Sequence, residues 1–306
     1  MSEANRSTIP DRGGIGTEQR NPRSMNLDRL SVAECVRLMN DEDATIAGAV
    51  GRASAEITAL IEAIEPRMKA GGRLIYLGAG TSGRLGVLDA SECPPTFQTP
   101  PNLVIGLIAG GDSALRKSSE GKEDEFNGAA PDLDALHLTP NDTVLGIAAG
   151  GTTPYVLGAL DHAARAGALA ALLTCAKVAT PPSAAHHIVI DTGPELLTGS
   201  TRMKAGTATK LVLNTISTTL MVRLGKTYEN LMVDLRASNN KLRDRAARII
   251  TMLTGLDRAA AFELLDRAQD SVKHAIVMHQ CGASYADAEA RLQKTDGRLR
   301  AALEAN

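Results

Sequence analysis

Aromatic residues are scarce in this chain of 306 residues, which has no tryptophan and in which phenylalanine, tyrosine and tryptophan together make up 2%. Proteins that bind single-stranded nucleic acid stack the bases on aromatic side chains, so the composition disfavours that class. The chain also lacks a basic block, since 33 Lys and Arg face 35 Asp and Glu and the formal net charge is −2. We therefore expect neither nucleic acid nor an anionic membrane as a partner.

Clustered cysteines and long apolar runs are missing as well. The four cysteines are far apart in the chain: Cys35, Cys93, Cys175 and Cys281. None belongs to a Cys-x-x-Cys or Cys/His pattern of metal spacing, which predicts reduced thiols, no metal site and a cytoplasmic protein. No stretch approaches 18 consecutive apolar residues and the start lacks a signal-peptide core, so we expect no membrane span.

The stretch that the chain is organised around is 73–95. An apolar, β-prone run over 74–77 is followed by three glycines: Gly78, Gly80 and Gly83. Helical spacing of apolar residues resumes at Leu85, so the stretch predicts a strand, a glycine-rich turn and a helix. Backbone N–H groups at a helix N-terminus attract phosphate, and two hydroxyl residues add donors there: Thr81 and Ser82.

The glycine pattern by itself does not identify the ligand. A dinucleotide site needs an acidic residue at the end of the next strand, but the run 103–108 ends in Ala109-Gly110-Gly111. No Gly-Lys-Ser/Thr follows the glycines, which disfavours an ATP-type loop. Two interpretations remain, a tight turn without a ligand and a sugar-phosphate site, and the hydroxyl pair favours the second.

Five apolar runs of strand length alternate with helical segments: Leu74–Leu77, Leu103–Ile108, Thr143–Ala148, Leu169–Thr174 and His187–Asp191. Nearly continuous apolar strands between helices predict an α/β fold, a doubly wound, five-stranded parallel sheet covered on both faces. Helical patterns precede the sheet, with Ser31 as an N-cap and one long apolar segment over 44–68, and a small all-helical domain follows it.

The predicted domains are a flexible N-terminal tail over 1–24, an α/β sugar-phosphate domain over 25–240 and a helical domain over 241–306. The tail is polar and rich in Gly, Pro, Arg and Asn. Its other interpretation is an arm that orders against a partner subunit or over the active site.

Ligands of doubly wound sheets bind beyond the carboxyl ends of the strands. Besides the first glycine loop, two segments follow strands there, 149–154 and 195–210. The predicted phosphate or substrate contacts from the three segments are Gly80, Thr81, Ser82, Gly83, Gly151, Thr152, Thr153, Ser200 and Lys204. For Lys204 and Ser200 the alternative is a helix-capping turn with a solvated lysine.

Two carboxylates lie close to these loops in the sequence. Glu92 is near the end of the helix that begins at the first loop, beside Cys93-Pro94-Pro95, and Glu120 follows the second strand. Acidic side chains usually face water, so sequence physics alone does not single them out.

Several long strings closely resemble the N-acetylmuramic acid 6-phosphate etherase family, of the sugar isomerase (SIS) fold superfamily. They are Leu77–Gly86, Asp89–Pro95, Thr17–Pro22, Asn40–Asp43, Thr198–Ser200, Arg202–Thr207 and Asn230–Asp234. The resemblance implies the SIS fold, a homodimer and a C-terminal bundle like a ubiquitin-associated domain.

The resemblance also implies cofactor-free cleavage of the ether between D-lactate and C3 of the sugar phosphate. Glu120 would be the base that removes the C2 proton of the open-chain aldehyde, and Glu92 the proton donor to the departing lactate oxygen. The two carboxyls then need opposite protonation states, and we expect Pro94, Pro95 and apolar neighbours to desolvate Glu92. A further reason to expect a homodimer is the apolar helix predicted over 211–224.

One loop departs from the family pattern. Members often read Ser-Gly-Arg-Thr-Pro where this chain has Gly150-Gly151-Thr152-Thr153-Pro154, so a hydroxyl and a guanidinium are missing. We expect Lys204 or Arg84 to take over phosphate or lactate contacts. Two alternatives of the same fold stay open, a sugar-phosphate-binding regulator and an aldose-ketose isomerase.

Overall fold

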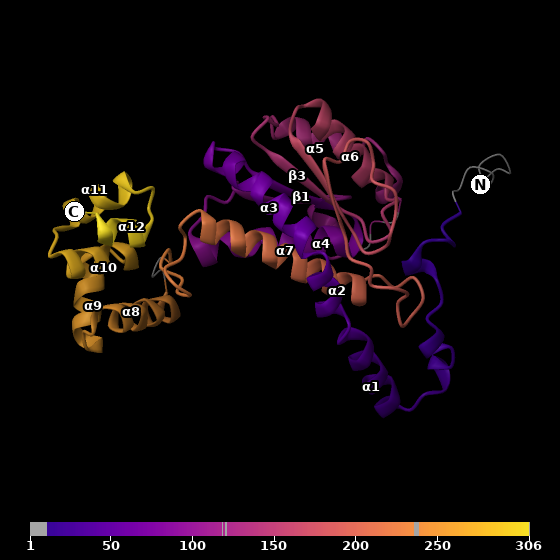
Figure 1. The fold of residues 1–306 in the computed structure, drawn as a ribbon, viewed down its shortest axis with the longest axis horizontal. Coiled ribbons are helices and arrows are strands. Elements are labelled where there is room, and N and C mark those ends of the chain that lie inside the picture. The colour runs from indigo at the N-terminus through magenta and orange to yellow at the C-terminus, as the bar shows by residue number, and fades with distance from the viewer. Residues whose placement is uncertain (1–10, 118, 120, 236–238, 306) are drawn as a thin grey trace. The chain divides into compact units, whose positions relative to one another are not determined.

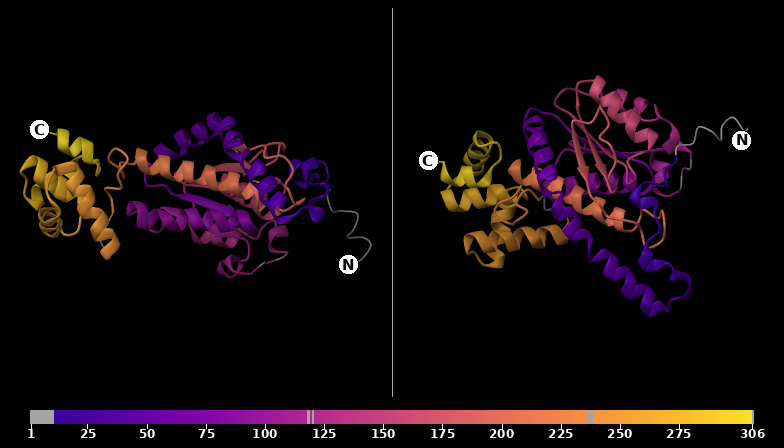
Figure 2. Two further views of the ribbon diagram at one scale, coloured as in Figure 1. Left: turned by 90° about the horizontal axis from the view of Figure 1, so that it is seen from below. Right: turned by 45° about the vertical axis from the view of Figure 1, so that its right-hand side comes forward.

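The computed structural model describes residues 11–117, 119, 121–235 and 239–305 (Figures 1 and 2). Contacts divide these residues into two units. The first holds the described residues of 1–90 and 104–216, and the second holds those of 91–103 and 217–306. The sequence-based boundary at 240/241 differs from this division and stays a prediction.

A five-stranded parallel sheet forms the centre of the first unit. The strands are β1 (Leu74–Gly78), β2 (Val104–Ile108), β3 (Thr143–Ile147), β4 (Leu169–Thr174) and β5 (His186–Val189). Their spatial order is β2-β1-β3-β4-β5, and every neighbouring pair is parallel. The predicted sheet is confirmed, and β5 ends two residues earlier than the apolar run suggested.

Helices cover both faces of the sheet (Figure 1). One face carries α5 (Ala130–Ala135) and α6 (Pro154–Arg165), and the other carries α3 (Ser54–Lys69), α4 (Gly80–Phe97) and α7 (Lys204–Arg223). Side chains of a strand alternate between the faces. Ile75 and Leu77 pack in the cluster that contains α6, whereas Tyr76 lies against α4, where a Cβ on Gly86 would be 2.9 Å from Tyr76 Cβ.

The N-terminal part of the first unit is helical, as predicted. Ser31 caps α1 (Val32–Asp43) in a reciprocal capping box with Glu34. The long apolar segment forms two helices rather than one, α2 (Ile46–Arg52) and α3, with a break at Ala53. Gly51, near the end of α2, weakens the helix there because glycine is conformationally free.

Short 3₁₀ helices complete the first unit: η2 (Gly16–Glu18), η3 (Pro22–Ser24), η4 (Leu27–Arg29), η5 (Asp112–Leu115) and η6 (Lys122–Asp124).

The second unit contains a helical bundle with its own core. Its helices are α8 (Asn240–Thr254), α9 (Arg258–Arg267), α10 (Val272–Cys281), α11 (Tyr285–Lys294) and α12 (Leu299–Glu304). Lys273 on α10 is buried, and its Nζ donates to Asp234 Oδ2 at 2.8 Å and to the Gly225 carbonyl at 3.0 Å. This ion pair ties the segment before α8 to the bundle.

Candidate functional site

The strand order reverses between β1 and β3, which is the switch point of the sheet. Gly78 at the end of β1 pairs in register with Ile147 at the end of β3. The loops that leave these two strands therefore start side by side, and one turns toward β2 while the other turns toward β4. A crevice for ligands is expected at this point in doubly wound sheets.

The first of these loops is tighter than its sequence suggested. Helix α4 begins at Gly80, so Thr81, Ser82 and Gly83 lie in its first turn rather than in a preceding turn. The helix starts so close to β1 because Gly83 has no side chain: a Cβ there would be 2.5 Å from the Gly78 carbonyl oxygen. The first N–H groups of α4 are thereby held at the switch point, where they can bind an anion.

The second loop has the same character. Gly151 has φ +72°, and a Cβ there would be 2.5 Å from Val178 Cγ2, so this position requires glycine. Thr153 is the N-cap residue of α6 and Pro154 its first residue, as predicted, but the Thr153 hydroxyl makes no cap hydrogen bond. Thr152 and Thr153 are both half-buried. The structure thus brings two helix N-termini with hydroxyl side chains to one edge of the sheet.

Lys204 lies at the start of α7, but its side chain turns into the protein. It is 4% exposed, and its Nζ donates to Glu42 Oε2 at 2.6 Å. Glu42 also accepts from Asn21 Nδ2 at 2.9 Å and from Arg23 Nη1 at 2.8 Å. Burial acts to raise the pKa of Glu42, but the hydrogen bonds from Lys204 and Asn21 hold that pKa below its ordinary value. The alternative of a solvated lysine is therefore wrong.

Glu195 fixes the start of α7 from the loop after β5. Its carboxylate is fully buried and accepts from the backbone N–H groups of Lys204 at 3.0 Å and Ala205 at 2.9 Å. Burial raises the pKa of Glu195, and the two backbone donors oppose that shift. The same helix start contacts α4, since a Cβ on Gly206 would be 3.5 Å from Thr81 Cγ2.

Residues 11–24 contact the loops of this site. Ile15 and Thr17 lie against Gly150, because a Cβ added to Gly150 would be 3.7 Å from Ile15 Cγ2 and 3.7 Å from Thr17 Oγ1. Glu18 lies against Gly199, with its Oε2 3.3 Å from a Cβ added there. These contacts place residues 15–18 against the loops that follow β3 and β5. We call residues 11–31 the N-terminal arm.

Of the two candidate catalytic carboxylates, Glu92 is among the residues that the structure describes. Glu92 is exposed, and α4 continues past it through Pro94 and Pro95 to Phe97 instead of ending nearby. The helix buries Cys93 and Phe97, and Glu92 points to another side, so its neighbours in the chain do not desolvate it as expected. Glu120 lies outside the described residues.

Comparisons with known proteins decide the family. A relative from Thermosynechococcus vestitus named N-acetylmuramic acid 6-phosphate etherase is 53% identical over 302 residues, covering 98% of this chain and 98% of that protein. A relative of the same name from Streptomyces avermitilis is 53% identical over 292 residues, covering 95% and 94%. The chain belongs to the N-acetylmuramic acid 6-phosphate etherase family.

Domain models match parts of this etherase-family chain. The model for the glucokinase regulatory protein N-terminal SIS domain matches residues 56–164, and that for the C-terminal lid domain of glucokinase regulatory protein matches residues 229–274. Among solved structures, a phosphoheptose isomerase from Neisseria gonorrhoeae aligns with a TM-score of 0.45 and 11% identity, covering 62% of this chain and 98% of that one.

Three buried polar residues around the start of α7 were not singled out in the sequence analysis: Glu42, Glu195 and Asn21. Glu42 and Asn21 occur in strings that carried the family resemblance, but their role depends on contacts between distant parts of the chain. Glu195 is nine residues before the N–H group that it accepts from, so no local capping pattern reveals it.

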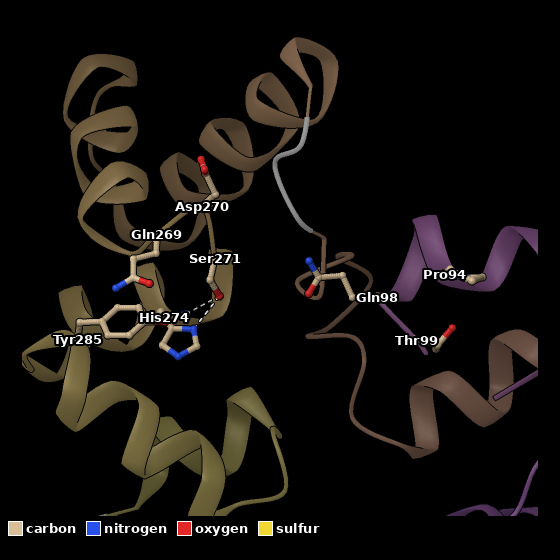
Figure 3. Close-up of a pocket in the computed structure, with 8 residues that line it drawn as sticks. All are labelled: Pro94, Gln98, Thr99, Gln269, Asp270, Ser271, His274 and Tyr285. Atoms are coloured by element: carbon tan, nitrogen blue, oxygen red, sulfur yellow. Dashed lines mark hydrogen bonds between the residues drawn. The ribbon is translucent and has the colours of Figure 1, made fainter. Parts of the chain in front are cut away.

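A second cavity, of about 600 Å³, lies in the other unit (Figure 3). On its bundle side, His274 contacts Ser271 Oγ through Nδ1 at 2.7 Å and Glu289 Oε2 through Nε2 at 2.5 Å, and its ring stacks on Tyr285. None of the described residues that line it is Lys or Arg. The predicted site residues that the structure describes do not line this cavity.

Within the described ranges, no group of three or more His, Cys, Asp or Glu side chains is placed to hold a metal ion. In the same part of the chain, no helix has the length and apolar character that a membrane crossing requires.

Proposed function

We propose that this protein cleaves the ether between D-lactate and C3 of N-acetylmuramic acid 6-phosphate, releasing N-acetylglucosamine 6-phosphate and D-lactate. The observation that carries the proposal is identity of 53% to a named etherase over 98% of both chains. The switch point supports it independently, because α4 and α6 both begin beside it and helix N-termini bind phosphate. The reaction belongs to the recycling of peptidoglycan amino sugars, and we place it in the cytoplasm.

The proposed reaction is a lyase reaction that needs no cofactor. Glu120 takes the C2 proton, which the neighbouring aldehyde makes acidic, and the C3–O bond then breaks as Glu92 gives its proton to the ether oxygen. Lactate leaves as the alcohol. Water adds at C3 of the unsaturated aldehyde, Glu92 takes one of its protons, and Glu120 returns a proton to C2.

The phosphate is held by backbone rather than by lysine in this proposal. The N–H groups at the starts of α4 and α6 carry partial positive charge, and Thr81, Ser82 and Thr152 add hydroxyl donors. Lys204 contributes indirectly, because its bond to Glu42 ties the start of α7 to the end of α1.

A homodimer is part of the proposal, but the surface that supports it is not the predicted one. Most apolar residues of the 211–224 segment are buried within the chain: Val212, Leu213, Ile216, Leu220 and Met221. Helix α1 instead exposes an apolar stripe, with Val32 82%, Val36 54% and Met39 40% exposed at helical spacing. A second copy on this stripe would remove it from water.

The dimer is tested by sedimentation velocity at micromolar concentration. The wild-type protein should sediment as a dimer, and Val36→Asp should shift it toward monomer because the substitution places a charge in the apolar stripe. A fully active wild-type monomer contradicts the proposal.

The roles of the carboxylates are tested with Glu92→Gln. Lactate release should fall by about 10²- to 10⁴-fold, the usual contribution of a positioned acid, whereas exchange of the C2 proton of N-acetylglucosamine 6-phosphate with D₂O should persist. Glu120→Gln should abolish both. Glu62→Gln on the exposed side of α3 is the control and should change neither. Equal loss of release and exchange in folded Glu92→Gln would show that Glu92 is not the acid.

A further inference from the structure

The reaction proposed above leaves one chemical group of the substrate without a partner. The lactyl substituent carries a carboxylate and a methyl group, and the loop after β3 offers Thr152 and no cation. Lys204, one expected replacement, is bonded to Glu42. Arg84, the other, donates through Nε to the Leu115 carbonyl at 3.2 Å.

A cavity of about 390 Å³ lies between the N-terminal arm and the loop after β5. Its walls come from 20–28 of the arm and 196–198 of the loop. Thr198 is on this wall, and the next residue, Gly199, contacts Glu18 of the arm. The cavity is therefore continuous in sequence with the segment that contains Ser200, a predicted substrate contact.

The chemistry of the lining is divided between one cation and apolar side chains. Apolar walls come from Met25, Leu27, Leu196 and Leu197. Arg20 is the cation, it is exposed, and among the described residues no ion-pair partner lies within reach of it.

The other polar side chains of the wall are mostly occupied by the fold. Asn21 donates to Glu42 Oε2 and to the Pro194 carbonyl, and Ser24 donates to the Leu196 carbonyl at 2.7 Å. Asp28 also lines the cavity, where its charge disfavours a second carboxylate, so a bound carboxylate would lie at the Arg20 end.

We propose that this cavity is the lactyl subsite of the proposed etherase, in which Arg20 binds the lactyl carboxylate and the leucines contact its methyl group. A guanidinium pairs with a carboxylate through two parallel hydrogen bonds, which fixes the orientation of the substituent as well as binding it. The ligand class is a 2-alkoxy monocarboxylate attached to a sugar phosphate. The subsite thus selects the lactyl ether over a free C3 hydroxyl.

The test compares two reactions of the same protein. Arg20→Gln should lower kcat/KM for lactate release from N-acetylmuramic acid 6-phosphate by roughly 10- to 100-fold, the usual loss of a charge-assisted hydrogen-bond pair. C2 proton exchange of N-acetylglucosamine 6-phosphate should stay within about twofold of wild type, because this sugar has no lactyl carboxylate for Arg20 to bind. Arg20→Lys should recover part of the loss.

The controls separate the outcomes. Arg29→Gln removes an exposed arginine of the same arm that is not among the lining residues, and it should change neither reaction. If folded Arg20→Gln loses both reactions equally, or loses neither, the lactyl subsite is overturned. The proposed function still holds in that case, provided that the wild-type protein releases lactate. A folded wild-type protein that releases no lactate overturns the proposed function, and the subsite with it.

Discussion

Replacing Lys204 by Met distinguishes a structural lysine from a substrate-binding one. The substitution keeps the length of the side chain and removes its charge. In the structure, Lys204 is 4% exposed and its Nζ is 2.6 Å from Glu42 Oε2, and Glu42 itself is 6% exposed. Loss of the ammonium leaves a buried carboxylate with one charged partner, Arg23, and one neutral one, Asn21.

The expected loss of stability follows from this arrangement. Removal of one member of a buried ion pair costs about 3–5 kcal/mol. Because Arg23 and Asn21 still bond to Glu42, we expect the lower limit, about 3 kcal/mol. For a domain of this size that loss lowers Tm by roughly 6–12 °C. Substrate affinity should change little as long as the protein is folded.

The measurement is urea and thermal unfolding followed by far-UV circular dichroism, with affinity for N-acetylglucosamine 6-phosphate measured in parallel. The double variant Glu42→Gln/Lys204→Met should lose less stability than the two single variants summed, with a coupling of about 1–3 kcal/mol. Unchanged stability of Lys204→Met together with a tenfold weaker affinity would refute this reasoning and return Lys204 to the ligand contacts.

Two further predictions concern the sheet. Gly83→Ala should destabilise the protein by about 1–3 kcal/mol in urea unfolding, because the new Cβ would be 2.5 Å from the Gly78 carbonyl oxygen. Gly48→Ala in α2 is the control and should not destabilise the protein, because the atom nearest to its new Cβ would be 3.8 Å away. Equal loss of stability in the two variants would contradict the steric argument. Asp142 is buried, and although burial acts to raise its pKa, hydrogen bonds from Arg73 and from backbone N–H groups lower it. Its contribution to stability should therefore be complete above pH about 4 and be lost as pH falls further, and Asp142→Asn should remove this dependence in pH-resolved unfolding.

The sheet could be predicted from the sequence because its signals are local. Each strand is a short apolar run with a glycine or a polar residue at its end or within three positions after it, and parallel strands buried on both faces give the clearest pattern of this kind. The first glycine loop was predictable for the same reason, since Gly83 is required by its contact with Gly78 in the same strand–loop–helix unit. Gly151 is required by a contact with Val178, beyond the end of β4, which no local pattern shows.

The ion-pair cluster and the arm could not be predicted in this way. Lys204 and Glu42 are 162 positions apart, and a lysine at a helix start usually faces solvent. The exposure of Glu92 was also missed, because Pro94, Pro95 and apolar neighbours in the chain were expected to desolvate it, whereas α4 continues to Phe97 and leaves Glu92 exposed. The roles of Glu92 and Glu120 therefore stay predictions.

The most direct test of the account is to incubate the folded protein with N-acetylmuramic acid 6-phosphate in D₂O. The account predicts D-lactate and N-acetylglucosamine 6-phosphate in equal amounts, with deuterium at C2 of the sugar because the proton removed there is replaced from solvent. Formation of a ketose without lactate would support an isomerase, and binding without turnover would support a regulator. Either result would contradict the proposed function.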